Sequence, residues 1–339
     1  MAATETSGAR RIGVIGGGIV GLCAALWLQR DGHRVFLVEP GTPGEGASFG
    51  NAGCLNGSSV TPMAMPGVIK QVPRWLMDPL GPLALRWQYL PKILPYLVRF
   101  VGSATPEKVR AGAHAMRPLV GPTVPLMREL AKMAGAGELI HQRGHLYVYR
   151  SAEAFAKDGF AWALRRENGV EVDEFDADEL RQLEPTLSRE YVRGLLVREN
   201  GHTSNPFGLV SAFVDLFRRQ GGEIVTARAF GFRLDGQRLT AIATDRGDQP
   251  ADAAIVCAGA YSKLLAATLG DPREGAGRGT CDAAAGRSDR AANARIGKDG
   301  RRRRTHPSAR ASLCLPLGRG IREGRFRLGI AAGERRRDR

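Results

Sequence analysis

The chain has 339 residues, 43% of them hydrophobic, and a formal net charge of +15. This length suits one large or two medium domains. No run of 18 apolar residues predicts a membrane-spanning helix, and the polar first ten residues predict no secretory signal peptide. The five cysteines form no C-x-x-C pair, so no metal site is expected. We expect these cysteines to be reduced thiols in a cytoplasmic protein.

The excess positive charge is confined to the end of the chain. Residues 272–339 hold 18 Arg and one Lys against seven acidic residues, whereas the preceding 271 residues hold 30 basic and 27 acidic ones. The body of the protein is therefore nearly neutral, and a basic surface for nucleic acid is not expected on it.

In chain order, the first predicted elements form one unit. An apolar strand over 11–15 is followed by the glycine-rich segment Gly16–Gly21, a helix over 22–30 and a second strand over 35–38, which ends at Glu39. This order is the βαβ fingerprint of a dinucleotide-binding fold.

Each residue type in this fingerprint has a physical reason. Gly16 permits a tight turn, Gly18 lets a diphosphate approach the backbone, and Gly21 lets the helix pack closely on the sheet. The helix N-terminus offers unpaired N–H groups and a positive dipole end to phosphates. Glu39 can accept hydrogen bonds from ribose hydroxyls.

The remaining patterns alternate helices and strands. Helices are expected over 106–135, broken by three prolines, over 152–167, after a capping Asp176, over 207–219 behind Asn205-Pro206, and over 263–269 with Ser262 as cap. Strands are expected over 145–149, 170–172, 191–197, 224–226, 239–244 and 253–257, the last as a buried parallel strand.

Five segments in this order carry a family resemblance: 14–21 with Glu39, 48–53 (Ser-Phe-Gly-Asn-Ala-Gly), 64–68, 144–150 and 256–262. With them, residues 11 to about 271 resemble the D-amino-acid oxidase superfamily of FAD-dependent oxidoreductases. Within it, the sequence is most similar to the bacterial D-amino-acid dehydrogenases. The segment 48–53 discriminates most, because nicotinamide dehydrogenases lack it.

The resemblance implies FAD as cofactor and a set of residues that bind it. They are Gly16, Gly17, Gly18, Ile19, Val20 and Gly21 at the diphosphate; Glu39 and the adjacent Pro40 at the adenosine ribose; Ser48, Asn51, Ala52 and Gly53 toward the diphosphate and flavin; Phe230 at the adenine; and Ala258 and Gly259 along the cofactor.

The implied fold is α/β. A Rossmann-like FAD-binding domain (1–60 and 200–271) is interleaved with an α+β substrate domain (61–199), and residues 272–339 form an Arg-rich tail. The substrate domain is expected to be incomplete, because the family's C-terminal motifs are not found after residue 272.

The implied chemistry is hydride transfer from the α-carbon of a D-amino acid to the flavin, followed by hydrolysis to a 2-oxo acid and ammonia. No catalytic residue is assigned; the polar residues His145, Tyr147, Tyr149 and His202 are interpreted as structural. The family implies a quinone as electron acceptor, and the aromatic segment 72–101 could place the protein peripherally at the inner membrane. Related enzymes of glycine, sarcosine or hydroxyproline, and a nicotinamide enzyme, are the alternatives.

The tail contains no valine and one aromatic residue, Phe326. We interpret it as a frame-shifted translation of a GC-rich gene, disordered over much of its length, which puts the activity of this chain in doubt. The alternatives are a basic nucleic-acid-binding arm and an undirected linker. Nucleic acid is the weaker alternative, because the tail lacks stacking aromatic residues and any recognisable module.

Overall fold

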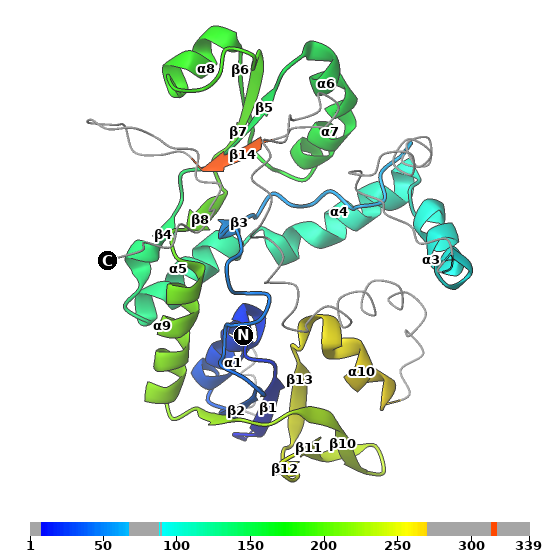
Figure 1. The fold of residues 1–339 in the computed structure, drawn as a ribbon, viewed down its shortest axis with the longest axis vertical. Coiled ribbons are helices and arrows are strands. Elements are labelled where there is room, and N and C mark those ends of the chain that lie inside the picture. The colour runs from blue at the N-terminus through cyan, green and yellow to red at the C-terminus, as the bar shows by residue number, and fades with distance from the viewer. Residues whose placement is uncertain (1–7, 68–87, 89, 270–312, 317–339) are drawn as a thin grey trace, which may run out of the picture.

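The computed structural model describes residues 8–67, 88, 90–269 and 313–316. Two parts are visible in Figure 1. The lower part contains both the N-terminal unit and residues 206–267, and the upper part contains residues 145–197 together with a strand from the tail. The chain order is interleaved: the sheet of the lower part takes strands from residues 11–38 and from residues 223–256, and the sheet of the upper part includes strands from the residues between them.

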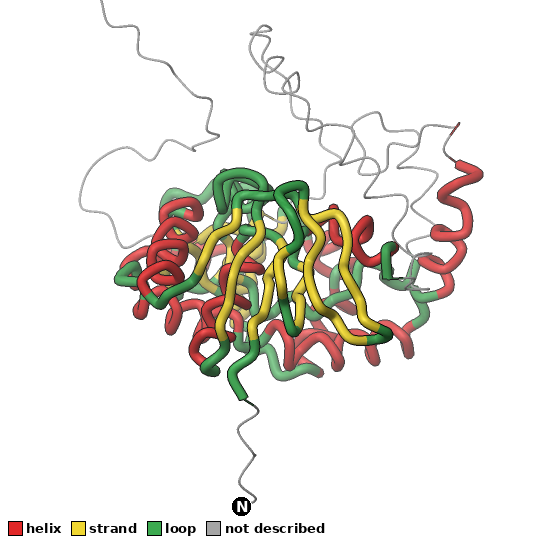
Figure 2. Tube along the Cα trace, turned by 90° about the horizontal axis from the view of Figure 1, so that it is seen from below, coloured by secondary structure: helices red, strands yellow, loops and turns green. Residues whose placement is uncertain are grey.

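The lower part is built on a parallel sheet in the order β13-β1-β2-β9 (Ala253–Val256, Arg11–Ile15, Arg34–Val38 and Glu223–Val225). Its side chains alternate between two cores. Val14, Val35 and Leu37 face one side, whereas Phe36 and Val38 face the other. Figure 2 shows strands running side by side with helices around them.

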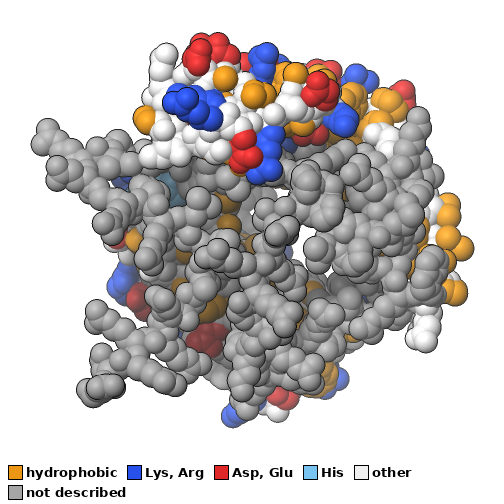
Figure 3. Space-filling view, turned by 45° about the horizontal axis from the view of Figure 1, so that its top comes forward, with side chains coloured by type: hydrophobic (Ala, Val, Ile, Leu, Met, Phe, Trp, Pro, Cys, Tyr) orange, Lys and Arg blue, Asp and Glu red, His pale blue; other side chains and the backbone are white. Residues whose placement is uncertain are grey.

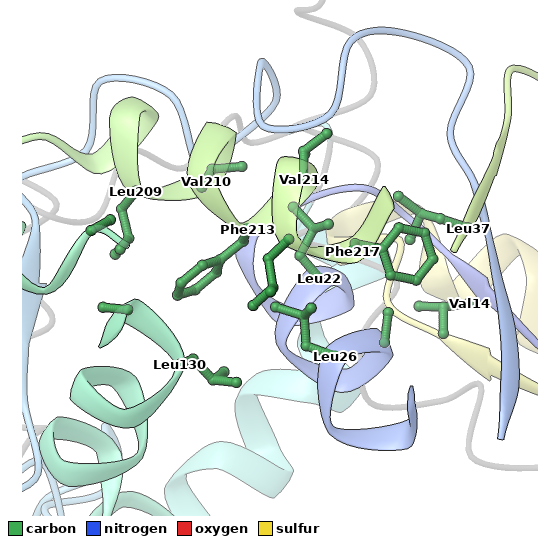
Figure 4. Packing of buried hydrophobic residues seen from close by; sticks show 14 of the residues in the cluster. Val14, Leu22, Leu26, Leu37, Leu130, Leu209, Val210, Phe213, Val214 and Phe217 are labelled. Carbon is green, nitrogen blue, oxygen red and sulfur yellow. The ribbon is translucent and has the colours of Figure 1, made fainter. Parts of the chain in front are cut away.

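The first core lies under two helices, α1 (Ile19–Arg30) and α9 (Pro206–Arg219), and α5 (Thr123–Met133) joins it. Figure 4 shows Phe213 and Phe217 of α9 in one buried cluster with Leu22 of α1 and Leu130 of α5. Asn205 caps α9 by accepting a hydrogen bond from the Gly208 N–H at 2.8 Å, as the sequence predicts.

The opposite face is covered by an antiparallel sheet and a short helix. The sheet has the order β10-β11-β12 (Ala229–Asp235, Arg238–Thr244, Gln249–Pro250), and the helix is α10 (Ser262–Ala267). A Cβ on Gly13 would lie 2.3 Å from Ile242 Cδ1, so this glycine permits β11 to pack directly on β1.

The upper part contains an antiparallel sheet of the order β14-β5-β7-β6 (Leu313–Pro316, His145–Tyr149, Arg193–Val197, Asp173–Phe175), in which only β14 is distant in sequence from the other strands. Helices α6 (Ala152–Lys157) and α7 (Gly159–Glu167) lie on one side, and α8 (Ala177–Leu183) packs with Leu146, Val148 and Leu196. Charged side chains of both signs mingle on the upper part in Figure 3.

The remaining elements connect these parts. A small antiparallel sheet has the order β3-β8-β4 (Cys54–Leu55, Gly201–Thr203, Ile140–His141). The helices α3 (Leu90–Gly102) and α4 (Pro106–Val120) precede α5, and the 3-10 turns η3 (Gly137–Leu139) and η4 (Gly259–Tyr261) complete the described elements. None of the described helices is both long enough and apolar enough to cross a membrane.

Three expected elements are corrected. The strand lies at 173–175 rather than 170–172, because α7 ends in a turn in which Gly169 has φ +72° and the Val170 N–H binds the Arg165 carbonyl at 3.0 Å. The helix over 152–167 is interrupted at Asp158. Ser262 is the first helical residue rather than the cap, because η4 runs directly into α10.

The end of the chain also differs from expectation. No substrate-domain strand was expected after residue 272, yet Leu313–Pro316 forms β14 and pairs with β5, with Cys314 opposite Tyr147. The strand 253–256 is parallel to β1 as expected, but its residues are half-buried rather than buried. The other expectations for the tail and for part of segment 72–101 fall on residues 68–87, 89, 270–312 and 317–339, which lie outside the described residues.

Candidate functional site

The turn between β1 and α1 has a backbone that accepts only glycine at two positions. Gly16 has φ +112°, and a Cβ there would lie 2.4 Å from the Cys257 carbonyl oxygen. A Cβ on Gly21 would lie 1.9 Å from the Gly16 carbonyl oxygen. These contacts hold the strand, the turn and the helix close together, as the fingerprint predicts.

No acidic side chain of α1 itself lies at the N-terminus of this helix. Gly18 is the N-cap and offers no side-chain hydrogen bond, and the first turn of the helix contains no acidic residue. Val20, in that first turn, is 66% exposed. The positive end of the helix dipole is therefore not neutralised from within the helix, which suits an anion such as a diphosphate.

Glu39 reaches this turn from the end of β2. Its Oε2 accepts a hydrogen bond from the Gly17 N–H at 2.7 Å, and its Oε1 accepts one from the Gly41 N–H at 3.2 Å. The carboxylate is thus held beside the glycine turn. Pro40 follows at the surface and is exposed.

The segment 48–53 closes over the same turn. Ser48 is 8% exposed, and its Oγ accepts a hydrogen bond from the Ile19 N–H at 3.0 Å. A Cβ on Gly18 would be 3.3 Å from this Oγ, so the Ser48 side chain and the glycine backbone are in close approach.

The rest of this segment is held in a compact turn. Asn51 Nδ2 donates to the Ser48 carbonyl at 2.9 Å, and the Gly53 N–H donates to Asn51 Oδ1 at 2.7 Å. Gly53 has φ +67° and its carbonyl accepts from the Thr203 N–H at 2.8 Å. Ala52 is exposed between them.

One further expected residue, Ala258, lies beside the glycine turn. The Cys257 N–H donates to the Ile15 carbonyl at 2.7 Å, which holds the end of β13 next to the end of β1. A Cβ on Gly16 would lie 3.1 Å from Ala258 Cα, and Gly259 has φ +55°. Phe230 lies in β10 of the separate antiparallel sheet, and its side chain is 55% exposed.

Sequence reasoning missed two residues that shape this site. The Gly44 N–H donates to the Gly17 carbonyl at 2.9 Å, and Gly44 has φ +89° with a Cβ position 2.6 Å from Val210. Phe49 packs edge-to-face on Phe207 with ring centroids 5.3 Å apart. For Gly44 the only sequence signal was the spacing of Gly41, Gly44 and Gly46, which is typical of an ordinary loop. Phe49 stands in the segment 48–53 that carries the family resemblance, but no role was assigned to it.

The polar residues interpreted as structural have partners in the described part of the chain. His145 is fully buried and its Nε2 lies 2.8 Å from the Gly201 carbonyl oxygen. Burial lowers the pKa of His145, although this hydrogen bond opposes the shift. Tyr149 accepts from Trp162 Nε1 at 2.7 Å and donates to Asp158 at 3.1 Å.

His202 stands apart from these residues. Its ring lies 5.1 Å from that of His141 across β8 and β4. Burial lowers its pKa first, and the nearby His141, Arg143 and His145 lower it further. No group of three or more His, Cys, Asp or Glu side chains within the described ranges has an arrangement that could hold a metal ion.

Comparison of the sequence with known protein families gives one match that covers most of the chain. The sequence profile described as FAD dependent oxidoreductase matches residues 11–320. The match runs beyond residue 271, where sequence analysis ended the resemblance, and it includes β14. The end point near 271 is therefore corrected.

Two curated relatives are similar over most of the chain. A D-amino-acid oxidase of Bradyrhizobium diazoefficiens is 44% identical over 266 residues, covering 78% of this chain and 63% of the relative. D-amino acid dehydrogenase 2 of Ralstonia nicotianae is 33% identical, covering 76% of this chain and 62% of the relative. The chain thus spans less than two thirds of the length of these relatives.

Solved structures share the fold. An L-proline dehydrogenase from P. horikoshii matches with a TM-score of 0.53 at 18% identity, covering 78% of this chain and 56% of that one. A glycine oxidase from Bacillus cereus matches with a TM-score of 0.51 at 18% identity, covering 76% and 57%. The glycine turn, the acidic end of β2 and the profile match agree, and the chain belongs to the family of FAD dependent oxidoreductases, which bind FAD.

Proposed function

We propose that this chain belongs to an enzyme that oxidises the C–N bond of a D-amino acid, giving a 2-oxo acid and ammonia, with FAD as cofactor. The observation that carries the cofactor is the segment Gly16–Gly21, where a Cβ on Gly16 or Gly21 would clash with the backbone, at the start of a helix whose first turn contains no acidic residue. The substrate class is supported by the names of the curated relatives.

The cofactor-binding roles form part of this proposal. The backbone of Gly16–Gly21 binds the diphosphate, Glu39 binds the adenosine ribose with Pro40 alongside, and Phe230 lies against the adenine. Ser48 and the turn 51–53 face the diphosphate and flavin, and Ala258 and Gly259 lie along the cofactor. The geometry supports most of these roles, because Glu39, Ser48 and Ala258 all approach one turn.

The proposal also divides the chain into two domains. We assign the described residues of segments 1–60 and 200–271 to the FAD-binding domain, and those of 61–199 together with β14 to the substrate domain. When bound, the FAD accepts the hydride from the substrate. The chain would hold the diphosphate through N–H groups whose positions are set by the glycine turn, so that the cofactor is oriented before the substrate reacts.

The electron acceptor separates the two activities named among the relatives. Oxygen as acceptor makes the protein an oxidase, like the Bradyrhizobium relative by name, and a quinone makes it a dehydrogenase, like the Ralstonia relative by name. A quinone acceptor would also place the protein at a membrane surface.

The first experiment tests cofactor binding. The chain is purified in the presence of FAD and, separately, of NAD, and the visible flavin spectrum and the thermal unfolding midpoint are recorded. We expect a yellow protein that FAD stabilises and NAD does not. A colourless protein whose unfolding midpoint is unchanged by FAD overturns the proposal.

The second experiment tests the reaction. The FAD-loaded protein is supplied with D- and L-amino acids, glycine, sarcosine and hydroxyproline, and release of 2-oxo acid and ammonia is measured. Hydrogen peroxide formation in air and reduction of a soluble quinone analogue under nitrogen distinguish the acceptors. Preference for glycine, sarcosine or hydroxyproline over every D-amino acid contradicts the assigned substrate class.

A further inference from the structure

The segment that follows the flavin-facing turn is fastened to a distant part of the chain. Residues 53–58 run beside residues 199–203, about 140 positions later. The two stretches are joined through the Gly53 carbonyl and the Thr203 N–H at 2.8 Å, and through pairing of Cys54 with His202 and of Leu55 with Gly201.

A buried polar pair continues this contact beyond the strands. Ser58 and Asn200 are both fully buried. The Ser58 N–H donates to Asn200 Oδ1 at 3.2 Å, and Asn200 Nδ2 donates to Ser58 Oγ at 2.9 Å. The Asn200 carbonyl accepts from the Gly144 N–H at 3.0 Å, so the pair is also tied to the start of β5.

An ion pair on the neighbouring residues reaches α4. Arg117 donates through two nitrogens to the two carboxylate oxygens of Glu199, at 2.6 and 2.8 Å, and its Nη1 donates to the Gly57 carbonyl at 3.0 Å. The two side chains are 24% and 28% exposed. A forked arginine–carboxylate contact of this kind fixes direction as well as distance.

The space around Gly57 shows how closely this segment is held. A Cβ on Gly57 would lie 2.9 Å from the Gly121 carbonyl oxygen at the end of α4. The backbone of 57–58 therefore lies between α4 and the turn 199–200, with polar contacts on both sides. Five residues earlier, the same stretch of chain makes the turn 51–53.

We infer that the paired contacts Ser58–Asn200 and Arg117–Glu199 position the turn 51–53 against the flavin, so that these four are positioning residues of the cofactor site. The inference rests on the proposed FAD-binding role of that turn. On its N-terminal side, the turn follows Ser48, whose Oγ accepts a hydrogen bond from the Ile19 N–H of α1. On its C-terminal side, it leads to this network, which includes Arg117 of α4. The network thereby couples the two domains at the cofactor.

The test compares Ser58→Ala and Glu199→Gln with the wild type and with a matched control. The control, Glu190→Gln, removes the same charge from another ion pair, Arg150–Glu190 at 3.3 Å, whose side chains are about half exposed. FAD affinity is measured by titration well below the unfolding midpoint of every variant. The flavin absorption maximum and midpoint potential are measured at saturating FAD.

We expect Ser58→Ala and Glu199→Gln to weaken FAD binding by about tenfold or more and to shift the flavin spectrum and potential, since small displacements of a supporting residue are strongly felt at a preorganised site. Glu190→Gln should leave all three unchanged. Wild-type spectrum, potential and affinity in a folded Ser58→Ala overturn the inference, even if Glu199→Gln does not fold. Failure of the wild type to bind FAD overturns the proposed function instead.

Discussion

The two four-stranded sheets of the described structure organise polar groups in different ways. Around the parallel sheet, the candidate cofactor site is made mostly of backbone: the turn Gly16–Gly21, the end of β13 and the N-terminus of α1. In the antiparallel sheet β14-β5-β7-β6, polar groups are paired with side chains of the helices beside it, such as Tyr149 with Trp162 and Asp158. A backbone site leaves a glycine pattern in the sequence, whereas a side-chain network leaves none.

The largest expected effect tests the backbone site. Gly21→Ala places a methyl group 1.9 Å from the Gly16 carbonyl oxygen, so the turn or the helix must move. We expect a loss of about 3 kcal/mol or more in unfolding free energy and loss of FAD binding. Denaturant unfolding and flavin titration measure the two effects.

Gly46→Ala is the matched control. No atom lies within 4 Å of the new methyl group, and its φ is outside the left-handed region, so we expect less than about 0.5 kcal/mol change. If Gly21→Ala is as stable as this control and binds FAD equally, the backbone description of the site is wrong.

The next effect separates the two sheets. Tyr149→Phe removes the oxygen that accepts from the buried Trp162 Nε1 and donates to Asp158. An unsatisfied buried donor should lower the unfolding free energy by about 1–3 kcal/mol. FAD affinity, measured on the same samples, should stay within experimental error of the wild type; a parallel loss of affinity would show that the sheets are not independent.

A smaller effect concerns a helix of the upper part. Asp176 caps α8 by accepting hydrogen bonds from the N–H groups of Asp178 and Glu179. The Glu179 carboxylate in turn accepts a hydrogen bond from the Asp176 N–H. Asp176→Ala should cost about 1 kcal/mol in unfolding free energy. Asp176→Asn should restore most of that loss; a variant no less stable than the wild type contradicts the role of the cap.

The smallest effect at neutral pH comes from a buried imidazole. Burial lowers the pKa of His145, so the unfolded chain takes up a proton more readily than the folded one. The stabilising contribution is complete above the unfolded pKa of about 6.5 and is lost as the pH falls through the lower folded value. Between pH 7.5 and 5, the wild type should therefore lose more stability than His145→Asn, and equal losses would contradict the assignment.

Much of the lower part was predictable because its signals are local. The β1–α1–β2 unit, the position of Glu39 and the start of α9 at Asn205-Pro206 follow from glycine spacing, apolar periodicity and capping residues. Element ends that depend on turns were less predictable. A strand was expected at 170–172 but is observed three residues later as β6, because Gly169 and the end of α7 hold Val170 in a turn.

The sequence alone predicted a nucleotide-binding turn before the first helix and the pattern of a flavoprotein, since a close approach of backbone at Gly16 and Gly21 requires glycines at fixed spacing. Only the tertiary structure decided that Ser48 lies against α1, that Ser58 meets Asn200, and that Leu313–Pro316 joins β5. These contacts join residues 29 to about 170 positions apart, and no local pattern encodes them, because each is selected by packing of the whole chain.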